Sequence, residues 1–281
     1  GEPTGLYELQ RQFGRLRFAA LTVEAARLAN QGFSAGPHLV RVARTASTAT
    51  TKTKIIKALG FDRKDFGPGT RVRAPELGTT LERYGAHGPV ALLVGNVARD
   101  WILAVRDQGG VLTLADLRDY RPKYREPLEI RYGRFIVITA PPPSAGGILL
   151  AQTLGTFPPD DWVRERSAEE RIHLLAEAYR ASLADRFRML GDPDFLPVDS
   201  ERLLDPKCLS ERRQQIASGT SNAAPVTLPA EQGTTHISIV DTEGNAVALT
   251  TTINNAFGAK ILAPESGVLL NDELDDFGPS G

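Results

Sequence analysis

The sequence predicts a protein of mixed α and β structure, in the broad α/β (α+β) class. Helical patterns that end at glycines dominate the first third of its 281 residues. Two pairs of alternating apolar runs farther along are typical of strands, and a long amphipathic segment between them is typical of a helix. The length suits one large domain or two ordinary ones, and the 41% hydrophobic content supports a buried core.

The N-terminal helices are predicted from their spacing and their ends. Apolar residues recur at helical intervals before Gly14 and again before Gly32, where glycine is expected as a C-cap. A shorter helix is predicted to begin near Pro75 and to end at Gly85. The stretch "NVARDWILAVRDQGG" predicts another helix, which stops at Gly109.

The middle of the chain predicts a strand pair followed by a long helix. In "LEIRYGRFIVITA" an alternating run turns into a continuous apolar one, which predicts two strands joined at Tyr132 and Gly133, the second more deeply buried. Ser167 and Glu170 then form a capping-box pattern at a helix start. One apolar stripe predicts that this helix faces the core, and it consists of Ile172, Leu175, Ala176, Tyr179, Leu183 and Phe187.

The last third predicts a β-hairpin that follows an exposed connection. Residues 221–233 are small, polar and proline-rich, and "TTHISIVDTEGNAVALTTTI" then gives two alternating runs around Gly244. The tripeptide Gly-Thr-Thr occurs twice. Around residues 78–80 it lies in a helical pattern, which predicts helix-surface threonines, whereas at 233–235 it precedes a strand.

Charge and composition exclude several functional classes. The 33 basic residues balance 34 acidic ones, so no positive field is available to gather nucleic acid. Cys208 is the single cysteine, which excludes an intrachain disulfide and a cysteine-based zinc site. The four histidines lack metal-ligand spacing, so neither a metal nor another cofactor is expected. No apolar run is long enough to span a membrane, and "GEPTGLYELQ" lacks signal-peptide features.

Thr234 has the position that an N-terminal nucleophile would need. A hydroxyl requires a nearby base, and a free α-amino group with a pKa of about 7.7 to 8.0 suits that task near neutral pH. Thr234 would gain this group if the bond after Gly233 were cut by its own attack on the Gly233 carbonyl, an N-to-O acyl shift and hydrolysis of the ester. Glycine at 233 tolerates the strained backbone involved. By spacing alone, an ordinary loop followed by a strand explains the same pattern.

A second candidate site is the acidic run "DELDDF", with its carboxylates at 272, 273, 275 and 276. Such a run suits either calcium binding or a solvated surface. The glycine and oxygen-ligand spacing of an EF-hand loop is missing. On composition alone the solvated surface is the simpler interpretation.

The segment "TTHISIVDTEGNAVALTTTINNAFGAKILAPESGVLLNDELDDF" resembles the start of the small subunit of γ-glutamyltranspeptidases, which are N-terminal nucleophile (Ntn) hydrolases. The resemblance continues upstream, in the family's order, through "PTGLYELQRQFGRL", "RAPELGTTL", "GGVLTLADLRDY", "PPPSAGG", "HLLAEAYRASLADR" and "LGDPDF". It covers nearly the whole chain. It implies a four-layer αββα Ntn-hydrolase sandwich, incomplete at both ends. Within one partial domain, 1–281, it implies a large-subunit-like part, 1–233, and the start of a small-subunit-like part, 234–281.

The resemblance also implies roles for individual residues. Thr234 matches the nucleophile, and Gly233 with Thr234 flanks the self-cleavage point. Thr252 matches the threonine whose hydroxyl binds the nucleophile. Asn254, Glu273 and Asp276 match positions that hold the α-amino group of a γ-glutamyl substrate, and their oxygens are suitable acceptors for an ammonium group.

The function implied is γ-glutamyl transfer or hydrolysis, acting on glutathione or related compounds with an amino acid or water as acceptor. The two parts of one autocatalytically cleaved precursor are expected to associate, in the periplasm or outside the cell, without a cofactor. Two alternatives stay open. One is a cephalosporin or glutaryl amidase of the same superfamily. The other is a catalytically incompetent relative, because the family's substrate-binding arginine, serine pair and oxyanion-hole glycines are expected to lie beyond this chain.

Overall fold

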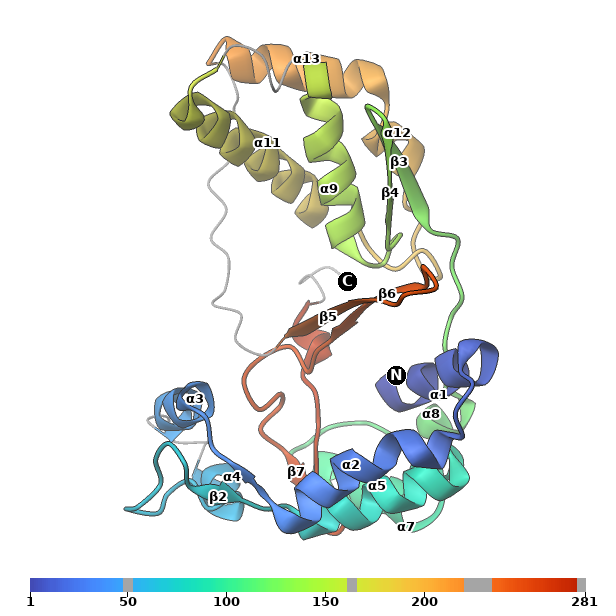
Figure 1. The fold of residues 1–281 in the computed structure, drawn as a ribbon, viewed down its shortest axis with the longest axis vertical. Coiled ribbons are helices and arrows are strands. Elements are labelled where there is room, and N and C mark those ends of the chain that lie inside the picture. The colour runs from blue at the N-terminus through green and yellow to red at the C-terminus, as the bar shows by residue number, and fades with distance from the viewer. Residues whose placement is uncertain (48–52, 161–165, 220–233, 277–281) are drawn as a thin grey trace. The chain divides into compact units, whose positions relative to one another are not determined.

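Helices and short antiparallel strand pairs make up the chain, which divides into two units. The computed structural model describes residues 1–47, 53–160, 166–219 and 234–276 (Figure 1). The first unit combines Gly1–Pro122 with Ala230–Gly281, and the second consists of Lys123–Pro229. The N-terminal helices therefore share a unit with the C-terminal strands. The division into parts at residue 233 stays a prediction.

Helices form most of the first unit. The most extensive packing is between α2 and α5, which lie side by side in Figure 1. The two helices approach closely because glycines of α5 face α2: a Cβ on Gly78 would lie 2.0 Å from Asn30 Oδ1, and one on Gly85 would lie 2.0 Å from Thr22 Oγ1. The helices are α1 (Glu2–Phe13), α2 (Phe18–Gln31), α3 (Pro37–Ser47), α4 (Thr53–Ala58), α5 (Pro75–His87), α6 (Val90–Leu93), α7 (Gly95–Arg106) and α8 (Leu114–Asp119).

The strands of the first unit form three antiparallel pairs. Pairing is longest between β5 (Thr235–Val240) and β6 (Ala246–Thr251), whose register runs from Thr235 opposite Thr251 to Val240 opposite Ala246. The turn between them is stabilised by Asp241, whose carboxylate accepts backbone N–H groups of Glu243 and Asn245. The shorter pairs are β1 (Phe33–Ser34) with β2 (Arg71–Val72) and β7 (Leu262–Ala263) with β8 (Val268–Leu269).

A buried carboxylate fixes the β7–β8 turn to the helices. Asp100 on α7 accepts the backbone N–H of Ser266 at 2.8 Å and its hydroxyl at 2.7 Å. The indole N–H of Trp101 also donates to Ser266 Oγ, and the Thr80 hydroxyl donates to the Ser266 carbonyl. The chain leaves β8 for the short 3₁₀ helix η2 (Glu273–Asp276) within four residues, so this anchor lies close in sequence to the acidic run.

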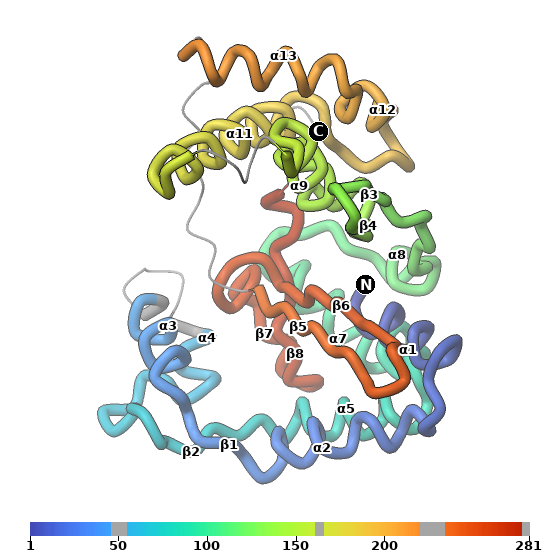
Figure 2. Tube along the Cα trace, turned by 45° about the horizontal axis from the view of Figure 1, so that its top comes forward, coloured from blue at the N-terminus to red at the C-terminus, as the bar shows by residue number. Residues whose placement is uncertain are grey.

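The second unit packs a hairpin and helices around α9. Its elements are β3 (Leu128–Tyr132), β4 (Phe135–Thr139), α9 (Ala145–Thr156), α11 (Ala168–Met189), α12 (Ser200–Leu203) and α13 (Pro206–Ala217). Figure 2 shows them along the Cα trace. Gln152 of α9 is fully buried and donates to Asp185 of α11 and to the Leu203 carbonyl. Arg212 of α13 binds the same Asp185 carboxylate, so one polar network joins the four helices α9, α11, α12 and α13. Cys208, also on α13, is exposed.

Several sequence predictions are confirmed. The mixed helix and strand content and the hairpin around Gly244 are present. Gly14 and Gly32 cap their helices, and Ser167 forms both bonds of the capping box with Glu170. Residues 221–233, predicted to be an exposed connection, lie outside the described residues.

Other predictions about helices are wrong. The helix that begins at Pro75 continues through Gly85 to His87, because Gly85 is used for close packing against α2. Thr80 is buried rather than on the surface, since it binds the Ser266 turn. On α11, Leu183 is buried, but Ile172 and Phe187 of the predicted core stripe are more than 60% exposed.

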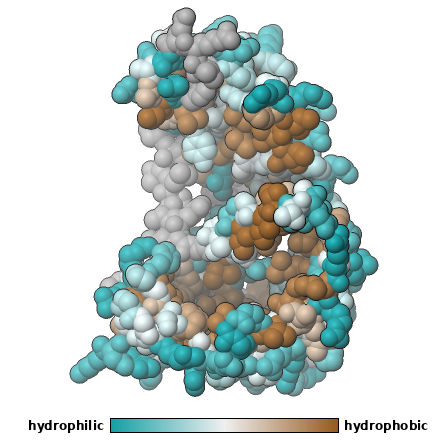
Figure 3. Space-filling view, in the orientation of Figure 1, coloured by the Kyte–Doolittle hydropathy of each residue, from teal (hydrophilic) through white to brown (hydrophobic). Residues whose placement is uncertain are grey.

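Strand β4 is not the more buried partner of its hairpin, since Phe135, Ile136 and Ile138 are exposed. Strand β5 is likewise exposed along its whole length. Figure 3 shows apolar surface over both hairpins. The hydrophobic patterns in these strands predicted the secondary structure correctly, but a face that could be buried is left uncovered by the described residues.

Candidate active site

Thr234 and Thr252 meet at one end of the β5–β6 hairpin. Thr234 immediately precedes β5, and Thr252 immediately follows β6. Because the ladder pairs Thr235 with Thr251, the next residues on either side also face each other. The Thr234 Oγ1 and Thr252 Oγ1 atoms lie 3.1 Å apart, within hydrogen-bond distance. The hairpin register therefore brings the predicted nucleophile to its predicted hydroxyl partner.

The turn after Thr252 places Asn254 beside this pair. Its backbone N–H donates to Thr252 Oγ1 at 2.8 Å, so the Thr252 hydroxyl lies between Thr234 and Asn254. Asn254 has a φ of 67°, in the left-handed region that asparagine tolerates better than most residues. Its side-chain Nδ2 donates to the Asp272 carbonyl at 3.1 Å. That bond leaves the amide Oδ1 as the acceptor that this side chain can offer to a ligand.

Glu273 brings a partly buried carboxylate to the same place. Burial raises the pKa of the Glu273 carboxyl above its usual range, and repulsion from Asp276 and Asp272 adds to this effect. The Thr252 hydroxyl and the Asn254 backbone N–H oppose it by stabilising the charged form. Glu273 Oε1 is enclosed and has no hydrogen-bond partner within 3.5 Å among the described residues. A buried carboxylate oxygen of this kind suits a cationic ligand.

The structure therefore brings together four of the predicted site residues: Thr234, Thr252, Asn254 and Glu273. Asp276 lies at the end of η2, is exposed, and acts on Glu273 through its charge. Gly233, predicted to precede the cleavage point, lies outside the described residues. The roles of all six residues stay predictions.

Two residues in contact with this set were not assigned a role from the sequence. Asp272 accepts the backbone N–H and the side-chain N–H of Asn255, each at 3.0 Å. The asparagine doublet and the acidic run were both visible in the sequence. Their pairing was not, because the two partners are 17 positions apart in the sequence and no local pattern indicates which carboxylate faces which amide.

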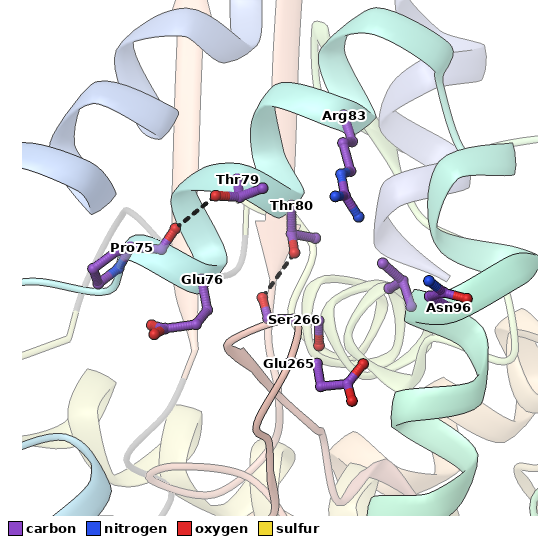
Figure 4. Close-up of a pocket in the computed structure, with 9 residues that line it drawn as sticks. Pro75, Glu76, Thr79, Thr80, Arg83, Asn96, Glu265 and Ser266 are labelled. Atoms are coloured by element: carbon purple, nitrogen blue, oxygen red, sulfur yellow. Dashed lines mark hydrogen bonds between the residues drawn. The ribbon is translucent and has the colours of Figure 1, made fainter.

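A separate cleft of about 390 Å³ opens beside the Ser266 turn (Figure 4). None of the predicted site residues lines it, and its walls are Pro75, Glu76, Thr79, Thr80, Arg83, Asn96, Val97, Glu265 and Ser266. Within it, the Thr80 hydroxyl donates to the Ser266 carbonyl. Among the described residues, no group of three or more His, Cys, Asp or Glu side chains is arranged to hold a metal ion.

Comparison with known proteins gives a family match over the entire chain. The family model described as "Gamma-glutamyltranspeptidase" matches residues 1–281. A glutathione hydrolase proenzyme of Pseudomonas aeruginosa is 36% identical over 285 residues, which cover 99% of this chain and 50% of that protein. The acylase ACY 1 proenzyme of a Pseudomonas species (strain V22) is 31% identical, covering 99% and 51%. The chain thus spans about half the length of the curated relatives it matches.

Solved structures show the same fold. A γ-glutamyltranspeptidase from Pseudomonas nitroreducens, complexed with L-DON, has a TM-score of 0.68 and 33% identity, covering 81% of this chain and 67% of that one. A cephalosporin acylase from Bacillus halodurans has a TM-score of 0.82 at 21% identity, covering 98% and 52%. These likenesses confirm the predicted fold class. The match of the family model to all 281 residues shows that the chain belongs to the γ-glutamyltranspeptidase family.

Proposed function

We propose that this chain contributes the nucleophile and the ammonium-binding residues of an enzyme that transfers or hydrolyses γ-glutamyl groups. The observation that carries the proposal is the meeting of the Thr234 and Thr252 hydroxyls, 3.1 Å apart, beside a Glu273 oxygen that lacks a partner among the described residues. The glutathione hydrolase names of the relatives support the same reaction class.

Maturation would begin with cleavage of the bond between Gly233 and Thr234. The Thr234 hydroxyl attacks the Gly233 carbonyl, the acyl group shifts from nitrogen to oxygen, and water hydrolyses the ester. This leaves a carboxylate on Gly233 and a free amino group on Thr234. Thr252 would hold the Thr234 hydroxyl in position during the attack, through the hydrogen bond between the two side chains.

In turnover, the Thr234 amino group takes the hydroxyl proton while Oγ1 attacks the γ-carbonyl of the substrate. That proton passes to the departing amine, which leaves as the acyl ester forms on Thr234. Water or the amino group of an acceptor then attacks the ester and restores the hydroxyl. Asn254 Oδ1 and the carboxylates of Glu273 and Asp276 would bind the α-ammonium group of the substrate.

The full reading frame that encodes this chain provides the test. We expect mass spectrometry to find fragments that end at Gly233 and begin at Thr234, and the product to release the amine of a γ-glutamyl anilide. Thr234→Ala should remain uncut and inactive. Thr234→Ser, which retains a hydroxyl, should still be cut. Cleavage and turnover by Thr234→Ala would overturn the proposal, as would an inactive wild-type product, which would favour the incompetent relative.

A glutaryl amidase is the second candidate, because acylase proenzymes are also among the relatives. Glutaryl substrates have no α-amino group, so the acceptors around Glu273 would have nothing to bind. The two functions are separated by comparing kcat/KM for matched γ-glutamyl and glutaryl anilides. Preference for the γ-glutamyl compound supports the first proposal, and preference for the glutaryl compound supports the second.

A further inference from the structure

The proposed site is built from two short segments that are apart in the sequence. The turn at 252–255 carries Thr252 and Asn254, and the segment at 271–276 carries Glu273 and Asp276. Besides the Asn254 side-chain bond to the Asp272 carbonyl, the Asp272 backbone N–H donates to the Ile253 carbonyl at 3.3 Å. Whatever fixes these two segments to each other also fixes the substrate-binding groups relative to the nucleophile.

The contact between Asp272 and Asn255 is a two-bond clamp between these segments. Asp272 Oδ1 accepts the Asn255 backbone N–H, and Oδ2 accepts the Asn255 Nδ2 group, each at 3.0 Å. An ionised carboxylate offers only acceptors, and both groups of Asn255 that face it are donors. Each of the two Asp272 oxygens therefore accepts one N–H group of Asn255. Bonds to an ionised acceptor are also stronger than neutral ones.

The clamp residues are the chain neighbours of two proposed substrate-binding side chains, Asn254 and Glu273. Asn254 precedes Asn255 and has a left-handed backbone conformation, which needs support from its surroundings. Its amide is turned so that Nδ2 binds the Asp272 carbonyl and Oδ1 remains for a ligand. Glu273 directly follows Asp272, so a backbone shift at Asp272 would change the position of the Glu273 carboxylate relative to Thr252 and Asn254.

We propose that Asp272 and Asn255 are positioning residues, which hold the Asn254 amide and the Glu273 carboxylate in place for the α-ammonium group of the substrate. Neither side chain is itself required to touch the substrate. This inference rests on the proposed γ-glutamyl function. It adds two residues that bind each other and position the site. Their substitution should weaken substrate binding, and only for substrates that have an α-amino group.

A reciprocal exchange tests the pair in the product of the full reading frame. With Asn255 oriented as it is here, Asp272→Asn replaces the charged acceptor with an amide N–H₂ that faces the Asn255 N–H₂, and Asn255→Asp places two carboxylates against each other. The double variant restores both bonds, because the amide now at position 272 would accept the backbone N–H and donate to the new carboxylate at position 255. We expect each single change to raise the KM of a γ-glutamyl anilide about tenfold with a smaller change in kcat, and the double variant to recover most of the loss.

Asp275→Asn is the matched control. It removes one negative charge from the same segment. The Asn255 Nδ2 group lies 3.4 Å from Asp275 Oδ2 but 3.0 Å from Asp272 Oδ2, so Asp275 makes the longer of its two contacts. We expect its KM to stay within about twofold of wild type. A glutaryl anilide gives a second comparison, since loss of ammonium positioning should not change its KM. Cleavage before Thr234, followed by mass spectrometry, shows that each variant has folded.

Three results would overturn the inference. They are an unchanged KM in correctly cleaved Asp272→Asn, a double variant no better than either single variant, and equal losses with the γ-glutamyl and glutaryl anilides. An inactive wild type would instead overturn the proposed function and, with it, the substrate role of the pair. An active wild type with an unaffected Asp272→Asn variant would overturn only the positioning role of Asp272 and Asn255 and would leave the proposed function standing.

Discussion

Glu273 carries a charge that its surroundings do not favour. Burial and the nearby Asp276 and Asp272 raise its pKa, so the neutral form persists to a higher pH than in an ordinary glutamate. Folding stability should accordingly fall as pH rises from the ordinary pKa through the raised one, because in that window the unfolded chain binds fewer protons. A bound ammonium group would offset this cost by pairing with the carboxylate.

The pH dependence of ligand binding follows from this environment. We expect the inhibition constant of L-glutamate, a non-reacting ligand with an α-ammonium group, to increase as the pH falls through the raised pKa of Glu273. Only the ionised carboxylate attracts the ammonium group. Glu273→Gln should bind L-glutamate more weakly at neutral pH and should lack this part of the pH dependence. An unchanged pH profile in Glu273→Gln would show that another group titrates.

The Thr252 hydroxyl connects Thr234 with the Asn254 turn. Thr252→Ala removes both bonds and leaves the Asn254 N–H without this acceptor, whereas Thr252→Ser retains the hydroxyl. A hydrogen bond of this kind contributes about 0.5–1.5 kcal/mol. We expect Thr252→Ala to lower kcat/KM for a γ-glutamyl anilide at least tenfold and Thr252→Ser to retain most of it. Equal losses in steady-state assays of the two variants would contradict this role for the hydroxyl.

At the scale of elements, the contact between α2 and α5 depends on the absence of side chains. A Cβ at Gly85 would meet Thr22 Oγ1 at 2.0 Å, and the backbone of Ala19 also lies nearby. We expect Gly85→Ala to lower the free energy of unfolding by about 1–3 kcal/mol through overpacking. Gly5 in α1 has open space around it, so Gly5→Ala should be neutral or stabilise by up to about 1 kcal/mol. Chemical denaturation of both variants measures the two changes in the free energy of unfolding. Equal changes would contradict the role of close packing at Gly85.

The elements also show where sequence patterns lose information. The capping box at Ser167 and the hairpin around Gly244 depend on residues close together in the chain, and both predictions are confirmed. Thr80 was predicted on a helix surface because its partner, Ser266, lies 186 residues away. Gly85 was predicted as a helix end because its packing partner is on another helix. The pairing of the two site threonines was predictable only through the family resemblance, and the clamp between residues 255 and 272 was not predicted.

At the scale of the whole molecule, much apolar surface is not covered by the described residues. The β5–β6 and β3–β4 hairpins expose aliphatic and aromatic side chains (Figure 3), and no described helix is long and apolar enough to cross a bilayer. Local alternation predicts that a strand has an apolar face. What covers that face is decided by parts of a protein that are distant in sequence.

Two isoleucines in the first unit test whether the β5 face is exposed while a side chain on α7 is buried in the 281-residue chain. Ile239 on β5 is 56% exposed, whereas Ile102 on α7 is 6% exposed. We expect Ile102→Ala to lower the free energy of unfolding by about 2–5 kcal/mol, because it leaves a cavity. Ile239→Ala should change it by less than about 1 kcal/mol. A similar loss from both substitutions in urea titrations would mean that the β5 face is covered in solution.

The exposed thiol on α13 has a practical consequence for such experiments. Cys208 is the only cysteine in the sequence and belongs to the second unit. A maleimide dye or spin label would therefore attach at one known position without prior mutagenesis, and its signal would follow the unfolding of that unit. Trp101 belongs to the first unit, and Trp162, the other tryptophan of the sequence, lies outside the described residues, so Trp162→Phe would leave the intrinsic fluorescence of Trp101 as a separate reporter of the first unit.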